Sequence, residues 1–433
     1  MDTRAPSFAE ASRFWIKLGF INFGGPTGQI AIMHDEIVER RAWLDESRFL
    51  HALSFCVLLP GPEAQQLAIY IGWLLHGTAG GIVAGSFFVL PAAVLIGALA
   101  YLYAAHAELW WVAGILDGLA AAVVGIVVAA TITIAKRALR AGAAWVIAAV
   151  VFIAIFIVGL PFPFIVAGAG AAGVVLGPAR LGVASSDHAG ETVAARPRTS
   201  TMLRVLAVGL AVWWLPLLAV AAVAGVESLY ARQAFFFSQV AVISFGGAYA
   251  VLTYVGREVA GRFGLFPRDV VAGLGLAETT PGPLILVVEF LAFVAAYRNP
   301  GELHPVVAGS IGAAVTVWAT FAPSFLWIFL GAPWVERLRA NERLRGALAA
   351  ITAAAVGVIA SLGVTLAAGV MFDVVRSVRP FAVEIVVPVL GSVDPFHLAV
   401  ASAALVATWR FRVHIVAIVA TSAAAGLLWA AVR

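Results

Sequence analysis

Long runs of apolar residues alternate with short polar segments along almost the whole 433-residue chain. Several runs reach the roughly 20 residues that an apolar helix needs to cross a lipid bilayer. The longest polar stretch runs from Arg180 to Arg204 and interrupts the pattern near the middle. The pattern predicts an all-α, polytopic membrane protein. Its clearest spans are Ile82–Tyr103, Val112–Ile134, Trp145–Leu160, Leu203–Gly225, Pro305–Leu330, Gly346–Phe372 and Val413–Val432.

Two helix-breaking motifs occur once in each half of the chain. Phe23-Gly24-Gly25-Pro26 is repeated as Phe245-Gly246-Gly247, and Pro60-Gly61-Pro62 is repeated as Pro281-Gly282-Pro283. The offset along the chain from Gly24 to Gly246 is almost the same as that from Pro60 to Pro281. Breaks inside apolar segments free backbone groups, and in membrane transporters such groups commonly bind ions. The shared spacing indicates an internal duplication.

The duplication predicts four parts along the chain. Residues 1–180 form a first membrane repeat, 181–202 a polar cytoplasmic linker, 203–228 an extra transmembrane helix, and 229–433 a second repeat. Nine spans are clear, and the early segments that carry the breaks either cross as well or turn back as re-entrant hairpins. The arms around the first Pro-Gly-Pro, Ser47–Leu59 and Glu63–Trp73, are short, which favours a hairpin.

Loop charges predict that the second repeat is inverted. Basic residues mark cytoplasmic loops of membrane proteins. In the first half Lys136 and Arg140 follow the span Val112–Ile134, whereas in the second half Arg337 and Arg345 precede the span Gly346–Phe372. The extra helix supplies the crossing that turns the second repeat over. We therefore expect a cytoplasmic N-terminus and a periplasmic C-terminus.

The breaks also predict where an anion would bind. A helix that starts after a break points its free N–H groups and positive dipole end at that break. Pro62 and Pro283 suit the starts of the returning helices. A kink or a close helix contact is the structural alternative for such motifs, and nearby hydroxyls can simply satisfy freed carbonyls. The duplication and the polar neighbours favour a substrate site, whose predicted residues are Asn22, Gly24, Gly25, Pro26, Thr27, Gln29, Pro60, Gly61, Pro62, Glu63, Gln65, Gln66, Ser244, Gly246, Gly247, Thr279, Thr280, Pro281, Gly282 and Pro283.

Three acidic residues are candidates for proton coupling. Glu63 and Glu278 flank the two Pro-Gly-Pro breaks, and Glu289 lies in the apolar segment after the second break. A carboxylate beside an anion site repels the substrate unless the carboxyl group is protonated, so a proton-coupled role is consistent with this placement. Capping of a helix N-terminus is the structural alternative for Glu63 and Glu278.

A pair of charged residues repeats at the offset that relates Gly24 to Gly246. Glu36 is followed by Arg41, and Glu258 is followed by Arg262. Charged runs of this kind are usually solvated helix ends. The repetition predicts an ion pair that braces each hairpin.

Composition excludes several classes of protein. The chain is 62% apolar and 12% charged with a mean hydropathy of +1.00, whereas a soluble domain is about 45–50% apolar and about 25% charged. The net charge of +4 comes mainly from loop arginines, so we expect no nucleic-acid partner. The single cysteine, Cys56, excludes an intramolecular disulfide and a cysteine zinc cluster. No HExxH or GxSxG motif occurs. We expect no enzyme activity, metal or cofactor.

Both motif sets together resemble the chromate ion transporter family, in its two-domain form. The matching stretches are FGGPTGQI at 23–30, RAWL at 41–44, LLPGPEAQQL at 58–67, SFGGAY at 244–249 and GLAETTPGPL at 275–284. The second half departs from the first at Ala248, which stands where the first half has Pro26. This difference argues against a strictly symmetric site.

The resemblance implies a bacterial inner-membrane secondary transporter that exports chromate and so confers chromate resistance. Chromate is a tetrahedral dianion close to sulfate in size and charge. Transport of sulfate or another dianion, and an anion channel, remain alternatives. A coupling proton and a homodimer are also left open, and the lipid bilayer is the expected surrounding.

Overall fold

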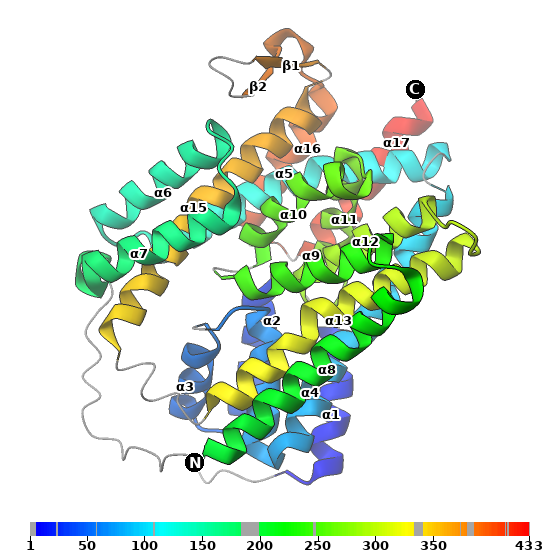
Figure 1. Cartoon of the computed structure of the whole chain (residues 1–433). Coiled ribbons are helices and arrows are strands. Elements are labelled where there is room, and N and C mark those ends of the chain that lie inside the picture. The colour runs from blue at the N-terminus through cyan, green and yellow to red at the C-terminus, as the bar shows by residue number, and fades with distance from the viewer. Residues whose placement is uncertain are drawn as a thin grey trace. The chain divides into compact units, whose positions relative to one another are not determined.

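The structure is a computed structural model that describes residues 6–22, 25–57, 59–106, 109–182, 199–245, 248–332, 341–372, 374–378, 385–411, 413 and 415–432. These residues are almost entirely helical (Figure 1). They form two compact units. Unit 1 comprises Met1–Tyr101, His188–Ala248 and Thr280–Ala340, and unit 2 comprises Leu102–Asp187, Tyr249–Thr279 and Asn341–Arg433. Each unit therefore contains segments from both halves of the chain.

Unit 1 is built from short helices around the breaks and from long apolar helices. Side-chain caps start several of them: Ser7 caps α1, Asp45 caps α3 and Ser228 caps α9, each by accepting a backbone N–H. The elements are α1 (Phe8–Ile21), α2 (Gly25–His34), the π-helix η1 (Asp35–Arg40), α3 (Glu46–Cys56), α4 (Glu63–His106, as far as Tyr101), α8 (Thr199–Ala224), α9 (Leu229–Ile243), the 3-10 turn η2 (Leu284–Leu286), α12 (Val287–Arg298) and α13 (Pro305–Gly331).

Helix α4 consists of two arms. His76 (φ −142°, ψ 27°) and Gly77 (φ 61°, ψ −155°) leave the helical conformation and divide α4 into arms 63–75 and 78–106. The arms fold against each other so closely that a Cβ added to Gly72 would lie 2.5 Å from the carbonyl oxygen of Gly80. The first arm is thus a short helix of the length that the sequence predicts after Pro-Gly-Pro.

Helix α13 is the central packing element of unit 1 in the second half of the chain. It lies against α8, α9 and α12 (Figure 1). The indole nitrogen of Trp318 donates to the carbonyl of Val212 on α8 at 3.1 Å. Both α12 and the inner face of α13 are buried, so polar side chains on them have no access to bulk water.

Unit 2 is built mainly from long helices in close contact. Helix α15 packs against α5, α6 and α7, and α5 packs against α11, α16 and α17. Glycines allow these approaches: a Cβ on Gly173 would lie 2.2 Å from the Gly346 carbonyl oxygen. The elements are α5 (Trp110–Ala138), α6 (Gly142–Phe156), α7 (Phe162–Arg180), α10 (Ala248–Phe263), α11 (Pro267–Thr279), α15 (Glu342–Met371), β1 (Val375–Val378), β2 (Ile385–Pro388), η5 (Leu390–Ser392), α16 (Pro395–Trp409) and α17 (Ile415–Val432).

Asp394 caps α16. Its carboxylate accepts the backbone N–H groups of Phe396 (2.8 Å) and His397 (3.2 Å), and the His397 ring nitrogen lies 3.2 Å from the second oxygen. Burial alone would raise the pKa of this carboxyl. The two N–H groups and His397 outweigh that effect, so the pKa of Asp394 lies below its usual value.

The predicted all-α polytopic membrane fold is confirmed. Among the described residues, seven helices are long and apolar enough to cross a membrane: α4, α5, α7, α8, α13, α15 and α17. Two shorter apolar helices of 15 residues each, α6 and α16, lie where the other two spans are predicted. One addition was not predicted: β1 and β2 form an antiparallel hairpin, with Val375 opposite Pro388, between α15 and α16 (Figure 1). They are the only strands in the described part of the chain.

The order of helices repeats between the two halves, as the duplicated motifs predict. Helix α8 lies between the two series of corresponding helices, and its role as an extra crossing stays a prediction. The corresponding elements are α1 and α9, α2 and α10, α3 and α11, the arms of α4 and the pair α12 and α13, α5 and α15, α6 and α16, and α7 and α17. The inversion and the boundaries at 180, 202 and 228 stay predictions, and residues 183–198 of the linker lie outside the described residues.

Candidate functional site

Two backbone hydrogen bonds join the breaks of one half of the chain to those of the other. The N–H of Gly61 donates to the carbonyl of Ser244 (2.9 Å), and the N–H of Gly282 donates to the carbonyl of Asn22 (2.8 Å). All four residues belong to unit 1. Asn22 and Ser244 occupy equivalent positions in the two repeats, and so do Gly61 and Gly282. The same contact is therefore made twice with the halves exchanged, and we call these four residues the crossed breaks.

The backbone at the crossed breaks is also alike in the two halves. Asn22 ends α1 with φ −88° and ψ 70°, and Ser244 ends α9 with φ −78° and ψ 76°. Gly61 (φ +124°) and Gly282 (φ +104°) adopt conformations that L side chains rarely reach. A Cβ on Gly282 would lie 2.2 Å from the Ala92 Cβ, and one on Gly61 would lie 2.7 Å from Gln66 Nε2. Both positions therefore require glycine.

Glutamine amides satisfy carbonyls that the breaks release. Gln29 Nε2 donates to the Gly282 carbonyl at 2.5 Å, and Gln66 Nε2 donates to the Pro60 carbonyl at 2.7 Å. Both side chains are fully buried. The amide oxygens of Gln29, Gln65 and Gln66 and both side-chain polar atoms of Asn22 have no hydrogen-bond partner among the described residues. Satisfying freed carbonyls thus accounts for part of this polar cluster. Of the remaining atoms, Asn22 Nδ2 is the donor available to an anion, whereas the amide oxygens can only accept hydrogen bonds.

The prolines lie at helix starts, as predicted. Pro26 lies in the first turn of α2, Pro62 directly precedes α4, and Pro283 directly precedes η2. The first turns of α2 and α4 carry N–H groups that no intrahelical carbonyl can accept. Pro281 and Thr280 are buried next to Gly282.

Several predicted residues cannot be placed. Gly24, Gly246 and Gly247 lie outside the described residues, as do the side chains of Thr27, Glu278 and Thr279. Glu278 and Thr279 end α11, which belongs to unit 2. Their roles stay predictions.

Two of the proton-coupling candidates belong to unit 1. Glu63 is the half-buried first residue of α4. Glu289 is 4% exposed on α12, and a Cβ on Gly97 of α4 would lie 3.5 Å from its Oε1. Its Oε2 has no hydrogen-bond partner within the described residues.

Sequence reasoning missed buried polar side chains on α9 and α13. Gln233 and Ser238 on α9 and Thr316, Thr320 and Ser324 on α13 are nearly or fully buried. Each has a polar atom without a partner in the described part of the chain. For α13 the available signal was the four-residue spacing of Thr316, Thr320 and Ser324 along the span Pro305–Leu330.

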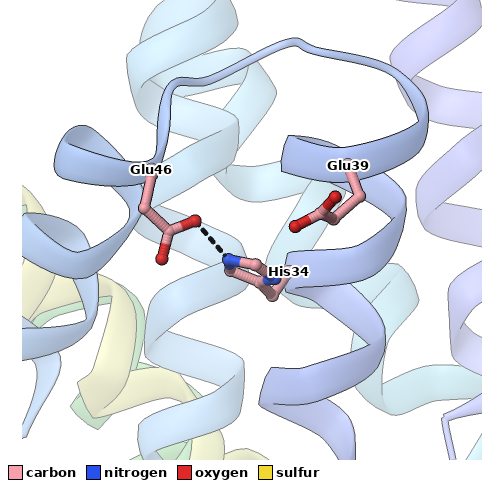
Figure 2. Close-up of side chains that lie close together, drawn as sticks. All are labelled: His34, Glu39 and Glu46. Carbon is pink, nitrogen blue, oxygen red and sulfur yellow. Dashed lines mark hydrogen bonds and ion pairs between the residues drawn. The ribbon is translucent and has the colours of Figure 1, made fainter.

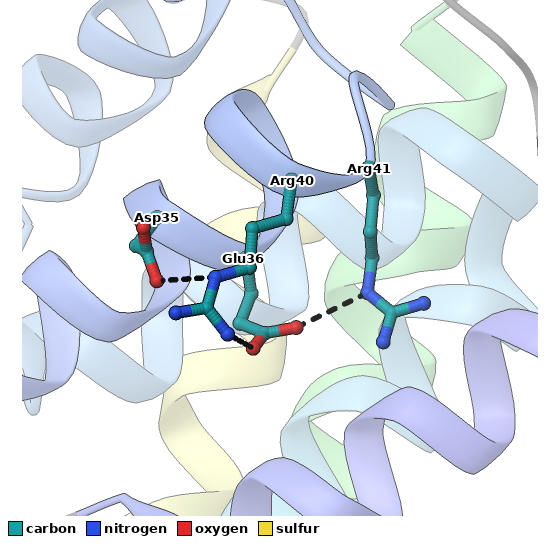
Figure 3. Close-up of polar contacts among 4 residues, drawn as sticks. All are labelled: Asp35, Glu36, Arg40 and Arg41. Carbon is teal, nitrogen blue, oxygen red and sulfur yellow. Dashed lines mark hydrogen bonds and ion pairs between the residues drawn. The ribbon is translucent and has the colours of Figure 1, made fainter.

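The predicted ion pairs are confirmed in both halves. Glu36 accepts from Arg40 Nη1 (3.1 Å) and Arg41 Nε (3.3 Å), and Asp35 pairs with Arg40 (2.9 Å; Figure 3). Glu258 pairs with Arg262 at 2.7 Å. Glu36 is buried whereas Glu258 is half-exposed, so the two pairs differ in strength.

His34, Glu39 and Glu46 gather within 4.8 Å of one another (Figure 2). His34 Nε2 lies 2.5 Å from Glu46 Oε2, which joins the end of α2 to the start of α3. Both glutamates are exposed. This contact between two helix ends accounts for the proximity of His34 and Glu46.

Unit 2 contains a cavity of about 780 Å³. Its lining is mostly apolar, with Tyr103, Asp117, Arg268 and His397 as its ionisable groups. None of the predicted site residues whose side chains the structure describes lines it. Tyr103 donates to Asp269 at 2.6 Å beside this cavity.

Three known proteins with similar sequences are named as chromate transport proteins or probable chromate transport proteins. The chain is 28% identical over 363 residues to a probable chromate transport protein of Synechococcus elongatus, covering 84% of this chain and 85% of the relative. It is 27% identical to a chromate transport protein of Cupriavidus metallidurans, with 83% of each chain covered. It is 29% identical to a chromate transport protein of Pseudomonas aeruginosa, covering 83% and 81%. No solved structure matches the chain.

The family model described as chromate transporter matches residues 9–174 and 231–427. These ranges fall within the two predicted repeats and leave out residues 175–230, which include all of α8. Together with the apolar helices, they make the chain a multi-pass membrane protein. The chain belongs to the chromate transporter family.

Proposed function

We propose that the chain is a secondary transporter that exports chromate across the inner membrane and thereby confers chromate resistance. The observation that carries the proposal is the pair of crossed breaks, where helix ends of both halves meet beside buried amides. The names of three relatives as chromate transport proteins support chromate as the substrate.

Neutral donors suit a dianion at this place. Each helix start contributes about half a positive elementary charge, and free N–H groups can donate to oxyanion oxygens. Asn22 Nδ2 adds an amide donor that is fully buried and has no partner among the described residues. Such a site binds a divalent oxyanion without an arginine, and the modest binding permits release.

Short arms favour a carrier with re-entrant segments. Helix α3 has 11 residues and the first arm of α4 has 13, which correspond to about 17 and about 20 Å. A hydrocarbon core is about 30 Å thick, so neither arm crosses it alone. Inverted repeats whose breaks meet inside the membrane are the arrangement that alternating access uses.

Proton coupling is the favoured source of driving force. Glu289 is buried in an apolar helix, where an unpaired charged carboxylate is costly. Protonation of Glu63, Glu278 or Glu289 when chromate binds would link anion export to proton entry. Glutamine variants of each residue test this, because the coupling residue's variant loses the pH dependence of transport while the other two retain it.

The experiment measures ⁵¹Cr-chromate in cells that express the protein and in inverted membrane vesicles made from them. Expressing cells should accumulate less chromate and grow at higher chromate, and inverted vesicles should take chromate up when energised. Sulfate in excess distinguishes the alternative substrate, since a sulfate transporter is blocked by low sulfate concentrations. Unchanged accumulation with the protein present in the membrane would contradict the proposal.

A further inference from the structure

Helix α13 carries a line of buried hydroxyl groups. Thr316, Thr320 and Ser324 are 0%, 2% and 1% exposed and follow one another at intervals of four residues, which places them on one helix face. None of their hydroxyls has a hydrogen-bond partner among the described residues. We call these three residues the donor line.

Several other helical hydroxyls in the same protein behave differently. Thr131 donates to the Val127 carbonyl (2.8 Å), Thr352 to that of Leu348 (2.8 Å) and Thr408 to that of Ala404 (2.7 Å). The fully buried Ser361 donates to the Val358 carbonyl at 2.8 Å. Bonding to the preceding turn is how a hydroxyl is ordinarily satisfied in an apolar helix. The hydroxyls of the donor line are not used in this way and remain available to a ligand.

One end of the donor line meets the crossed breaks. A Cβ built on Gly61 would lie 3.2 Å from Ser324 Oγ, so this hydroxyl lies beside the first Pro-Gly-Pro break. Two intervals of four residues separate Ser324 from Thr316, which corresponds to about 12 Å along the helix. The line therefore leads away from the break region through the interior of unit 1.

Gln233 on α9 lies beyond the other end of the donor line. Gln233 Nε2 donates to the Ala292 carbonyl at 3.1 Å, which fixes the direction of the amide. Its oxygen lies 3.0 Å from the place of a Cβ on Gly312, one turn before Thr316 on the same face of α13. An amide oxygen only accepts hydrogen bonds and repels an oxyanion. The part of this face that suits an anion thus begins at Thr316 and ends at the break.

We propose that the donor line is a substrate pathway along which the oxyanion moves to and from the crossed breaks. Each hydroxyl donates to one oxyanion oxygen, and neighbouring hydroxyls are about 6 Å apart along the helix, so the ion is passed from one donor to the next. Several weak contacts bind the ion without trapping it. The inference rests on the proposed function and adds three substrate-contacting residues to it.

The test compares ⁵¹Cr-chromate flux into liposomes that contain the purified full chain or its variants. Thr320→Val and Ser324→Ala each remove one hydroxyl at nearly constant shape, and Thr320→Ser retains a hydroxyl. The matched controls are Thr131→Val and Ser361→Ala, whose hydroxyls bond within their own helices. Flux below saturation should fall about tenfold in the two donor-line variants, which is the loss of one hydrogen bond to a charged ligand. Thr320→Ser and both controls should retain most of the flux.

Thermal unfolding of the same samples separates transport from folding. A hydroxyl without a protein partner can be removed with little loss of stability, so Thr320→Val and Ser324→Ala should unfold at the wild-type temperature. Thr316→Val provides a further donor-line variant if one of these fails to insert. Wild-type flux in Thr320→Val and Ser324→Ala overturns the inference, as does a loss of flux that is matched by a loss of stability.

A different result would contradict the proposed function itself. Wild-type liposomes that move neither chromate nor sulfate overturn the proposed function and this inference together. If the wild-type protein moves sulfate but not chromate, the same variants are compared with ³⁵S-sulfate. A selective loss of sulfate flux in the donor-line variants then supports the pathway, and unchanged sulfate flux overturns it.

Discussion

Replacing Gly282 with alanine tests the geometry of the crossed breaks. Gly282 has φ +104° and donates its N–H to the Asn22 carbonyl. The added Cβ would lie 2.2 Å from the Ala92 Cβ on α4, whereas carbon atoms in contact are about 3.5–4 Å apart. The loop must therefore move by more than about 1 Å. The hydrogen bond to Asn22 and the one from Gln29 should both be weakened.

Two effects add to the expected cost. A side chain at this backbone conformation costs about 1–3 kcal/mol, and overpacking of a buried site costs about 1–3 kcal/mol more. Gly282→Ala should therefore lower the free energy of unfolding by about 2–6 kcal/mol. Adding Ala92→Gly removes the clash and leaves the backbone strain, so the two changes should show a favourable coupling of about 1–3 kcal/mol.

The assay is unfolding in mixed detergent micelles titrated with dodecyl sulfate, followed by circular dichroism. Gly301→Ala is the matched control, because Gly301 also has a positive φ of +61° but has no atom within 4 Å of an added Cβ. It should cost about 1–2 kcal/mol. Equal costs for Gly282→Ala and Gly301→Ala, or no coupling between Ala92→Gly and Gly282→Ala, would refute the close packing of the second break.

Three further predictions follow from the contacts of single side chains. Glu36→Gln should lower the free energy of unfolding by about 1–3 kcal/mol, because the buried side chain loses its charge-assisted hydrogen bonds from Arg40 and Arg41. Glu258→Gln at the more exposed pair should cost less than about 1 kcal/mol, and equal losses in the dodecyl sulfate titration would contradict this. Gln29→Met should lower the free energy of unfolding by about 1–3 kcal/mol, because the buried Gly282 carbonyl loses its donor. Gln65→Met should lower it by less, because the amide oxygen of Gln65 has no partner among the described residues. The wild-type protein should be more stable than Asp394→Asn above the unfolded pKa of Asp394, about 3.9. This difference should be lost as pH falls through the lower folded pKa, and a difference that stays constant between about pH 6 and about pH 2 would contradict the lowered pKa.

Apolar runs and duplicated motifs predicted most of the fold. The runs are decisive because a bilayer requires about 20 apolar residues for each helix, and the nine clear spans coincide with nine apolar helices of the described chain. The hairpin of β1 and β2 was missed because residues 375–378 and 385–388 are too short and too close to a membrane span to give a separate pattern. The break at His76 and Gly77 falls between the predicted arm Glu63–Trp73 and the predicted span Ile82–Tyr103, so the two arms of α4 agree with the segments read from the sequence.

The site was predicted only in part. The combined Pro-Gly-Pro and Gly-Gly motifs identify the breaks, because proline removes a backbone donor and glycine allows a positive φ. The pairing of Gly61 with Ser244 and of Gly282 with Asn22 could not be predicted, because offsets between repeats relate equivalent residues and not contacting ones. Thr316 and Thr320 gave only a weak signal, since hydroxyls in apolar helices usually bond to their own backbone. Their availability depends on the orientation of side chains inside unit 1.

The central claim is that a divalent oxyanion binds at the crossed breaks. The most direct measurement is the structure of the purified protein with chromate bound, with chromium located by anomalous diffraction at its absorption edge. We expect the chromium peak at the breaks that contain Asn22, Gly61, Ser244 and Gly282, next to Ser324 on α13, with the chromate oxygens within hydrogen-bonding distance of donors there. A peak instead in the unit 2 cavity beside Arg268 and His397, with none at the crossed breaks, would contradict the account.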